Sequence, residues 1–541
     1  MIRLQFALML AALVAGPAAA GSVIDAPGGT VRGTEDRSVR VFRGIPFAQP
    51  PVGERRWRPP AELPRWEGVR EATRSGPACV QPKPRAASIY AWKLPAMSED
   101  CLSLNIWAPQ AADRAPVFVW IHGGALTTGS ASEPIYDGTA LAKRGLVVVS
   151  INYRLGVLGY LTHPALSAEA PDGVSGNYGL LDQVAALAWV RRNISVFGGD
   201  PANVTIAGES AGALSVMALM AAPPARGLFQ KAIAQSAYMV SAPALRERQN
   251  GMVPAEEQGS DLAAKLGAAD LAALRAMDAE AIVEKTAGTG YFPFITIDGK
   301  TLPRQLVDTF DRSEQAPVPI LAGFNSGEIR SLRFLLPKPP AGEAAYEAAI
   351  RTGYGDLADA FLARYPAKTI EESMLAATRD AMYGWTAERL VSNQAALGQP
   401  AYFYLFDHGY PATQEWDLHA FHAAELPYIF DTAGKTPPLW PKIPSNLAER
   451  RLTDAMGDYW ASFAATGKPR AKGWPDWRPY SEDRSFLHFA DVPRAGKNLF
   501  PGVAALHEAV VCRRRAAGDI AWNWNVGVAA PPLPPKAKGC Q

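Results

Sequence analysis

A serine stands at the centre of the motif with the clearest chemistry in the sequence, Gly208-Glu209-Ser210-Ala211-Gly212. The motif follows an apolar run, 204–207, and precedes an apolar helical pattern, 211–220. Small residues on both sides of the serine permit a sharp strand-to-helix turn, which exposes its hydroxyl beside a helix N-terminus. We therefore predict that Ser210 is a nucleophile. An ordinary tight turn is the alternative, because a chain with 47 glycines can contain this pattern by chance.

A second glycine-containing motif, His122-Gly123-Gly124-Ala125, follows an earlier apolar run, 117–121. Attack of a hydroxyl on an ester carbonyl creates an oxyanion, which backbone N–H groups must stabilise. Loops of this kind supply such groups together with the residue after the nucleophile. We predict that Gly124, Ala125 and Ala211 are the donors. A plain glycine-rich turn is the alternative, but two such loops after two predicted strands favour an oxyanion hole.

The elements that would position these loops alternate along the chain. Apolar runs without polar alternation are typical of strands buried on both faces, and helical patterns such as 180–194 lie between them. We therefore predict an α/β fold with a large, mostly parallel central sheet covered by helices on both faces. Residues 344–398 are predicted as a helical excursion. The predicted strands are 117–121, 146–151, 204–207, 231–234, 318–322 and 401–405.

The two ends of the chain are predicted to lie outside the folded domain. Residues 1–20 are predicted as a signal peptide because Arg3, an apolar stretch and small residues near Ala20 follow one another. A retained membrane anchor is the alternative. A single domain is expected over 21–528, with a Pro-rich tail over 529–541. We expect export to a periplasm or the cell exterior, and no membrane span once the signal is removed.

The charges and cysteines narrow the possible partners. The chain carries 54 basic and 52 acidic residues, well mixed, for a net charge of +2, so nucleic acid is not an expected partner. Export makes disulfides possible. Cys79 and Cys101 bracket a Pro-rich loop that a bridge would close, and Cys512 and Cys540 could form a second bridge. Free thiols are the alternative for all four cysteines.

Several longer motifs resemble the type-B carboxylesterase/lipase family, which includes the cholinesterases. The resemblance implies an α/β-hydrolase fold with a gorge, hydrolysis of a small-molecule ester, and no cofactor. It runs over most of the chain in order. The motifs are Arg43-Gly44-Ile45-Pro46-Phe47-Ala48 with Pro50-Pro51, the disulfide segment Glu99-Asp100-Cys101-Leu102-Ser103-Leu104-Asn105-Ile106, Asn152-Tyr153-Arg154, and Phe197-Gly198-Gly199-Asp200-Pro201.

The resemblance also implies the partners of Ser210. The family's acid falls on Glu328 in the run 323–328, and its histidine falls on His422 before the run 425–428. His422 would take the Ser210 proton, and Glu328 would orient the imidazole. His419 lies outside the motif. Glu425 is a rival acid for which we expect a structural ion pair instead.

No metal site is predicted, because His419 and His422 lack an evident third ligand and the chemistry needs none. Departures from the family pattern concern the substrate. Ala125 replaces a glycine, Leu126 stands where phenylalanine is common, and Ile329 follows the acid where glycine is usual. By resemblance, Trp92, Leu126 and Phe324 are predicted to contact substrate. Packing within the loop is an equally open role for Trp92.

Two other functions compete with simple ester hydrolysis. Some relatives in this family have lost the triad and are non-catalytic adhesion proteins, but Ser210, Glu328 and His422 are all retained here. A hydrolase of a larger xenobiotic ester, an amide or a thioester is the second alternative. The sequence predicts neither the natural ester nor the oligomeric state.

Overall fold

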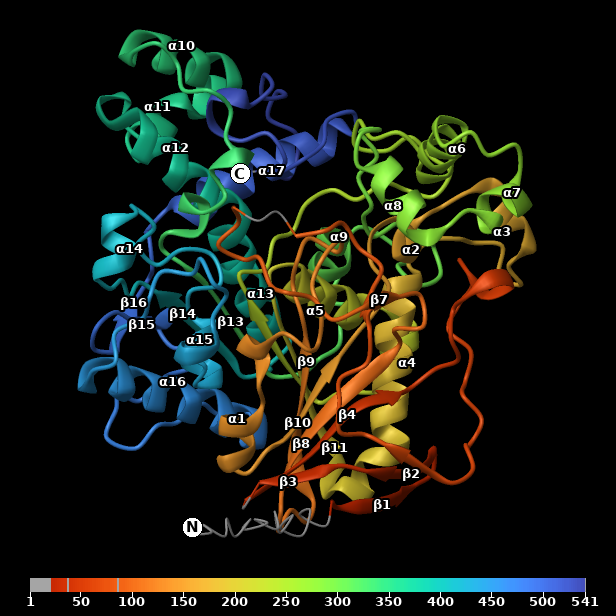
Figure 1. The fold of residues 1–541 in the computed structure, drawn as a ribbon. Helices are drawn as coiled ribbons and strands as arrows, with labels where there is room; N and C mark the ends of the chain where they lie inside the picture. Colours follow the sequence, from red (N-terminus) through yellow and green to blue (C-terminus); the bar gives the residue numbers. More distant parts are fainter. Residues whose placement is uncertain (1–20, 37, 85–86, 541) are drawn as a thin grey trace, which may run out of the picture.

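A twisted sheet of eleven strands forms the centre of the computed structural model, which describes residues 21–36, 38–84 and 87–540. Its order is β16-β15-β14-β13-β12-β11-β9-β10-β8-β4-β3, and neighbours from β15 to β10 are parallel (Figure 1). The predicted α/β fold with a mostly parallel sheet is therefore confirmed. The parallel strands are β9 (Ala115–Ile121), β10 (Val147–Ile151), β11 (Gly199–Glu209), β12 (Lys231–Gln235), β13 (Ile320–Asn325), β14 (Ala401–Phe406) and β15 (Ser485–Phe489).

The two edges of the sheet are antiparallel, which the sequence did not predict. Strand β16 (Arg494–Lys497) pairs with β15, and on the other edge β8 (Ser103–Pro109) joins β10 to β4 (Val39–Pro46) and β3 (Thr34–Asp36). Strand β8 is almost entirely buried, so it shows none of the polar alternation that marks a half-exposed antiparallel strand. A small separate sheet contains β1 (Val23–Ala26), β2 (Gly29–Arg32) and β5 (Val69–Glu71).

Strand β9 shows why the apolar runs lack alternation. Val117, Val119 and Ile121 pack in the core on one face of the sheet, whereas Phe118 and Trp120 pack in the core on the other. Helices α4 (Tyr178–Asn193), α5 (Ala211–Ala221) and α13 (Trp385–Ala396) cover the first face, and α15 (Leu426–Phe430) and α16 (Leu447–Thr466) cover the second. Both faces are therefore apolar, as the prediction of double burial requires.

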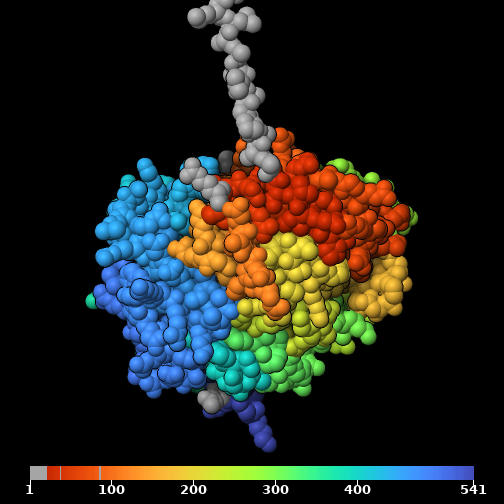
Figure 2. Space-filling view, turned by 90° about the horizontal axis from the view of Figure 1, so that it is seen from below, coloured from red at the N-terminus to blue at the C-terminus, as the bar shows by residue number. Residues whose placement is uncertain are grey.

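Two groups of helices project from the sheet at the top of Figure 1. One contains α10 (Glu343–Tyr354), α11 (Ala358–Leu362) and α12 (Ile370–Arg379), which pack with α17 (Val503–Ala517) around a core of their own. The other contains α6 (Ala255–Lys265), α7 (Leu271–Ala276) and α8 (Ala279–Thr286). The first group is the helical excursion expected near 344–398. Viewed from below, N-terminal segments lie beside the C-terminal segments that include α16 (Figure 2).

The chain ends are described in part. The predicted signal peptide, 1–20, lies outside the described residues and stays a prediction. Val528, Ala530 and Leu533, from the end of the domain and the Pro-rich tail, pack against the α10–α12 core. Both cysteine pairs form disulfides, Cys79–Cys101 and Cys512–Cys540. Among the described residues, no helix has the length and apolar character needed to cross a bilayer.

Candidate active site

The loops that carry the predicted catalytic residues leave neighbouring strands at the same edge of the sheet. The ladder pairs Gly208 at the end of β11 with Ile121 at the end of β9. On the other side of β11, Glu209 pairs with Gln235 of β12, which in turn pairs with Gly323 of β13. In open α/β sheets, this carboxyl edge is where ligands bind.

Ser210 occupies a strained turn between β11 and α5. Its backbone has φ 57° and ψ −122°, an unfavourable conformation for a residue with a side chain. The glycines around it are sterically required: a Cβ on Gly208 would lie 2.5 Å from the Gly212 carbonyl carbon, and one on Gly212 would lie 2.1 Å from the Ile121 oxygen. The geometry is that of a nucleophile elbow, which presents the serine at the strand end.

The loop Gly123-Gly124-Ala125 lies directly against this elbow. A Cβ on Gly123 would come within 3.2 Å of the Ser210 Cβ, so the two loops touch. Gly124 has φ +104°, and the next residue, Ala125, also has a positive φ of 55°. Within the described part of the chain, the N–H groups of Gly124, Ala125 and Ala211 have no hydrogen-bond acceptor. Three donors beside one serine are available to bind an oxyanion.

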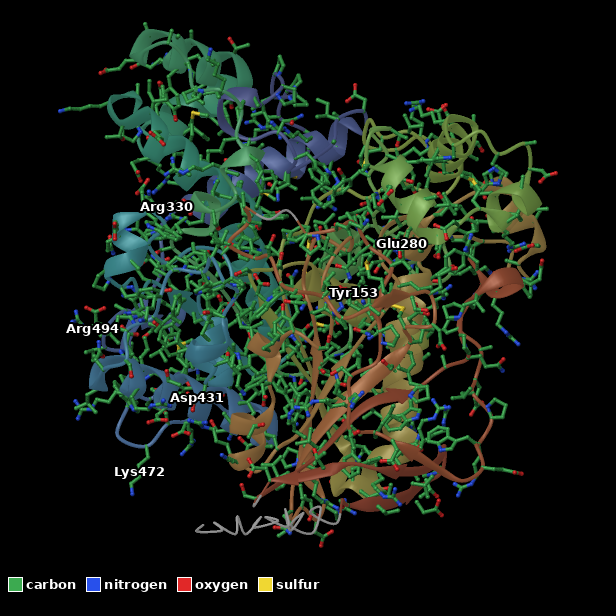
Figure 3. All side chains as sticks on the ribbon, in the orientation of Figure 1. Tyr153, Glu280, Arg330, Asp431, Lys472 and Arg494 are labelled. Carbon is green, nitrogen blue, oxygen red and sulfur yellow. A yellow bond between two sulfur atoms is a disulfide. The ribbon has the colours of Figure 1, made fainter. Side chains whose placement is uncertain are left out.

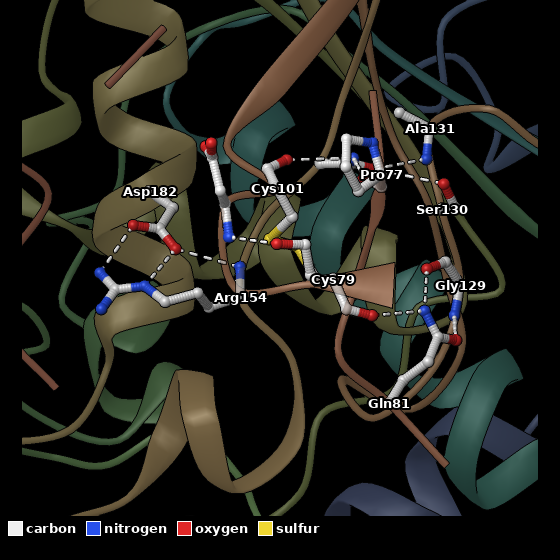
Figure 4. The surroundings of a disulfide bond; sticks show 12 residues. Pro77, Cys79, Gln81, Cys101, Gly129, Ser130, Ala131, Arg154 and Asp182 are labelled. Carbon is white, nitrogen blue, oxygen red and sulfur yellow. Dashed lines mark hydrogen bonds and ion pairs between the residues drawn. A yellow bond between two sulfur atoms is a disulfide. The ribbon is translucent and has the colours of Figure 1, made fainter. Parts of the chain in front are cut away.

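Buried amide side chains hold this loop in place (Figure 4). The Gln81 amide donates to the Gly129 carbonyl at 2.9 Å and accepts from the Gly129 N–H at 2.8 Å. Asn152 accepts from the Ala131 N–H at 2.8 Å and donates to the Cys101 carbonyl at 3.1 Å. The disulfide segment and the oxyanion loop are therefore joined by hydrogen bonds from side-chain amides to main-chain groups.

His122, the first residue of the oxyanion motif, is structural in its contacts. Tyr153, which lies in the interior in Figure 3, donates from its hydroxyl to the His122 carbonyl at 2.7 Å, and the two rings stack with centroids 4.5 Å apart. Burial lowers the pKa of His122 to about 4, so the ring is neutral near pH 7.

Glu328 and His422 meet through an unusual backbone contact after β13. The Gly327 N–H donates to the Ala420 carbonyl at 2.9 Å. This hydrogen bond brings Glu328, which follows Gly327, close to His422, two residues after Ala420. The Glu328 carboxylate accepts from the Asn325 N–H at 2.8 Å with one oxygen, and its other oxygen contacts Nδ1 of His422. This contact places a proton on Nδ1, so Nε2 is the nitrogen that can exchange a proton with Ser210.

Nε2 of His422 lies 3.1 Å from a carboxylate oxygen of Glu209, the residue immediately before Ser210. Burial lowers the pKa of His422, but the carboxylates of Glu209 and Glu328 more than compensate and raise it to about 9. Burial raises the pKa of Glu209 to about 8, although the neighbouring His422 acts in the opposite direction. The imidazole therefore lies between two buried acids, one of them adjacent to the serine.

His419 and Glu425, the alternatives considered for the base and the acid, lie in different surroundings. The His419 side chain is 41% exposed and contacts Asp417 at 3.1 Å. Glu425 is fully buried and accepts from the side-chain amides of Gln235 at 2.8 Å and Asn325 at 2.7 Å. The expected ion pair of Glu425 was wrong for the described residues, because neutral amide donors satisfy the carboxylate instead of a cation.

Three neighbours of His422, namely Glu209, Tyr90 and Tyr383, were not predicted from the sequence as site residues. Glu209 was noted only as part of the serine motif. The Tyr90 hydroxyl donates to the His422 carbonyl at 2.8 Å, and the Tyr383 ring centroid lies 5.4 Å from that of His422. Their sequence neighbours do not reveal these contacts, because loops from distant parts of the chain create them.

The residues predicted to contact substrate occupy different environments. Trp92 is partly buried against one core, whereas Leu126 and Phe324 are buried in the other. Their contact with substrate stays a prediction. In the described residues, no group of three or more His, Cys, Asp or Glu side chains is arranged to hold a metal ion.

Comparisons with known proteins agree with this geometry. Residues 20–502 match the carboxylesterase family. The chain is 36% identical to fumonisin B1 esterase of Sphingopyxis macrogoltabida, with 87% of each chain covered, and 37% identical to para-nitrobenzyl esterase of Bacillus subtilis, with 85% and 93% covered. A solved PNB esterase structure superposes with a TM-score of 0.78 at 32% identity, covering 90% of this chain and 99% of the other. The chain belongs to the carboxylesterase family and is a carboxylic ester hydrolase.

Proposed function

We propose that this protein hydrolyses carboxylic esters through an acyl-enzyme on Ser210, with His422 as general base and Glu328 as the acid that orients it. The observation that carries the proposal is the position of His422, with Nδ1 on Glu328 and Nε2 facing the residue that precedes Ser210. The strained elbow and the three free N–H groups support it, because each serves a separate step of acyl transfer.

The first half of the reaction forms the acyl-enzyme. Nε2 of His422 takes the Ser210 proton as Oγ bonds to the ester carbonyl carbon. The N–H groups of Gly124, Ala125 and Ala211 stabilise the resulting oxyanion. The carbonyl re-forms as the bond to the alcohol oxygen breaks, and His422 returns its proton to the departing alcohol.

The second half releases the acid. His422 removes a proton from water, and the hydroxide bonds to the acyl carbon. The second oxyanion uses the same three donors, the bond to Ser210 Oγ breaks, and the proton returns to that oxygen. Through both halves, the carboxylates of Glu328 and Glu209 stabilise the imidazolium, because each lies beside one ring nitrogen.

Covalent labelling tests the nucleophile directly. We expect a fluorophosphonate to modify Ser210, as identified by peptide mass spectrometry, and Ser210→Ala to lower kcat/KM on 4-nitrophenyl butanoate by about 10⁴-fold or more. The matched control is Ser236→Ala, the residue immediately after the neighbouring strand β12, which should keep both labelling and turnover. Label on another residue, or substantial turnover by Ser210→Ala, would contradict the proposal.

A further inference from the structure

Two tyrosines, Tyr238 and Tyr383, lie in contact with each other beside the candidate base, His422. Tyr383 is 2% exposed and belongs to a π-helical turn, Asp380–Gly384, that joins α12 to α13. Tyr238 lies in the loop after β12, and its ring meets the Tyr383 ring edge-on with centroids 6.3 Å apart. Because Tyr383 also packs against His422, the pair lies close to where an ester reacts.

A buried side chain from a third segment of the chain fixes the positions of the two tyrosines. Asn523 donates from its side-chain amide to the Met239 carbonyl and to the Ala381 carbonyl, both at 2.9 Å. The Met239 N–H in turn donates to the Thr386 hydroxyl at 2.9 Å. Since these contacts lie next to or close to each tyrosine in the chain, they fix the spacing of Tyr238 and Tyr383. π-Helical turns interrupt α-helices most often at functional sites.

Neither tyrosine hydroxyl has a hydrogen-bond partner among the described residues. Tyr90, which also lies beside His422, differs because its hydroxyl bonds to the His422 carbonyl at 2.8 Å. Neither hydroxyl is sealed from solvent, so both are open to water or to a ligand. A ligand that displaces this water without accepting a hydrogen bond leaves the hydroxyl unpaired, at a cost of about 1–3 kcal/mol. Two such hydroxyls held side by side therefore suit a ligand that accepts hydrogen bonds.

The surrounding charges define what kind of acceptor fits. Burial, and then the negative charge of Glu328, raise the pKa of Tyr383 well above its usual range, and burial and Glu209 do the same for Tyr238. Both hydroxyls therefore stay protonated and can only act as neutral donors or acceptors. The same carboxylates would repel an anionic substituent on the substrate. A neutral oxygen is the acceptor that fits.

We propose that Tyr238 and Tyr383 donate hydrogen bonds to a neutral ether, keto or hydroxyl oxygen that the ester carries near its reacting carboxyl group. This inference rests on the proposed function and deepens it by naming a substrate class: oxygen-substituted esters are preferred over hydrocarbon esters of the same shape. A site that hydrogen-bonds a substrate group discriminates strongly against the analogue without it, because its own polar groups are then left unpaired.

Matched ester pairs test the preference. On the acyl side, 4-nitrophenyl methoxyacetate is compared with 4-nitrophenyl butanoate. On the alcohol side, 2-methoxyethyl butanoate is compared with butyl butanoate. In each pair an ether oxygen replaces a methylene, and kcat/KM of the ether ester is divided by that of the hydrocarbon ester. We expect Tyr383→Phe and Tyr238→Phe each to lower this ratio about tenfold in one arm, which identifies the side that carries the oxygen.

The ratio is independent of how much of a variant folds, because both esters are measured on the same sample. Tyr402→Phe is the matched control: Tyr402 is 3% exposed, its hydroxyl also has no partner among the described residues, and it lies at the opposite end of β14 from the site. Its ratio should equal that of the wild type.

An unchanged ratio in both arms for both tyrosine variants would overturn the inference. If kcat/KM also falls equally on ether and hydrocarbon esters, the hydroxyls are assigned to the orientation of His422 rather than to substrate. Failure of the proposed function is distinguishable from both, because the wild-type protein would then lack fluorophosphonate label on Ser210.

Discussion

Glu209 is a buried acid at the point where a positive charge develops during catalysis. Its pKa of about 8 lies below the pKa of about 9 of His422, so Glu209 is negatively charged in the range where His422 titrates. Its side chain is 5% exposed, and the oxygen that faces Nε2 of His422 has no hydrogen-bond donor in the described chain. A buried carboxylate without donors is costly on its own. Beside His422, the same charge stabilises the imidazolium that forms when Ser210 is deprotonated, and this benefit offsets the cost.

The charge of Glu209 should therefore appear in the pH dependence of turnover. Because Glu209 raises the pKa of His422, Glu209→Gln should lower it, and the neutral base should be available at lower pH. We expect the acidic limb of the kcat/KM profile to move to lower pH by about one unit. Maximal kcat should fall as well, since the imidazolium loses a counter-charge.

The matched control for this experiment is Glu388→Gln, another buried acid, which hydrogen-bonds to Tyr480 and Arg484 rather than to His422. Its pH profile should keep the wild-type acidic limb. A limb that moves to higher pH in Glu209→Gln would contradict the role assigned to Glu209.

At the scale of elements, the sequence predicted the parts whose surroundings are uniform. All six apolar runs overlap strands β9 to β14, because a strand buried on both faces needs apolar residues at every position. The runs 146–151 and 318–322 begin one residue before β10 and two residues before β13. The antiparallel edge strands β8 and β16 and the parallel strand β15 were missed. In β15 the buried and half-buried positions alternate over only five residues, too short a run to distinguish from a loop.

The candidate site was predictable to the extent that each residue has a local motif. Ser210 and the Gly124 loop follow strands and are marked by glycines that the turns require. Glu328 and His422 came only from the family resemblance, because their meeting depends on the Gly327–Ala420 contact between distant segments. Tyr383 was not predicted, since a π-helical turn has no residue signature that distinguishes it from the surrounding α-helix.

A cluster of polar side chains around His408 connects the end of β14 to two helices. His408 lies between Glu449 of α16, at 3.0 Å, and Asp491, at 2.9 Å, and the Tyr428 hydroxyl of α15 donates to the same Glu449 carboxylate at 2.7 Å. Burial lowers the pKa of His408, but the hydrogen bonds and charges of Glu449 and Asp491 raise it above its usual value. α15 begins only four residues after His422, so the cluster also holds the segment that carries the base in place.

The cluster should make stability depend on pH. Because the folded-state pKa of His408 lies above the unfolded value of about 6.5, its stabilisation is complete below that pH and declines as pH rises through the folded-state pKa. We expect His408→Asn to lower Tm more at about pH 5.5 than at about pH 9. Thermal unfolding followed by circular dichroism measures both.

His488→Asn is the control for this measurement, because His488 pairs with Asp407 at a partly exposed site where an ion pair contributes little. Its effect on Tm should be small at both pH values. A His408→Asn effect that grows with rising pH would show that the cluster does not stabilise the fold through a protonated histidine.

At the scale of the whole molecule, the two disulfides stabilise regions with different relations to the site. Cys79–Cys101 closes the loop that carries Gln81 and Tyr90, which bond to the oxyanion loop and to His422. Cys512–Cys540 joins α17 to the C-terminal tail, whose Leu533 packs on the α10–α12 core. One bridge therefore closes the loop that contacts the oxyanion loop and the base. The other closes a segment that attaches the tail and also contains Asn523, which bonds to the chain beside Tyr238 and Tyr383.

Removing each bridge should separate stability from catalysis. We expect Cys512→Ser with Cys540→Ser to lower the free energy of unfolding by about 2–4 kcal/mol, measured by urea denaturation. Its kcat/KM on 4-nitrophenyl butanoate per fluorophosphonate-titrated site should stay near the wild-type value. Asn523 keeps its own hydrogen bonds to Met239 and Ala381, and the tail after it bonds to none of the residues around Ser210. Cys79→Ser with Cys101→Ser should also lower kcat/KM per titrated site, since Gln81 and Tyr90 are then less firmly placed. Equal losses of turnover in the two variants would mean that the tail, and the α10–α12 core beneath it, control the site as closely as the loop does.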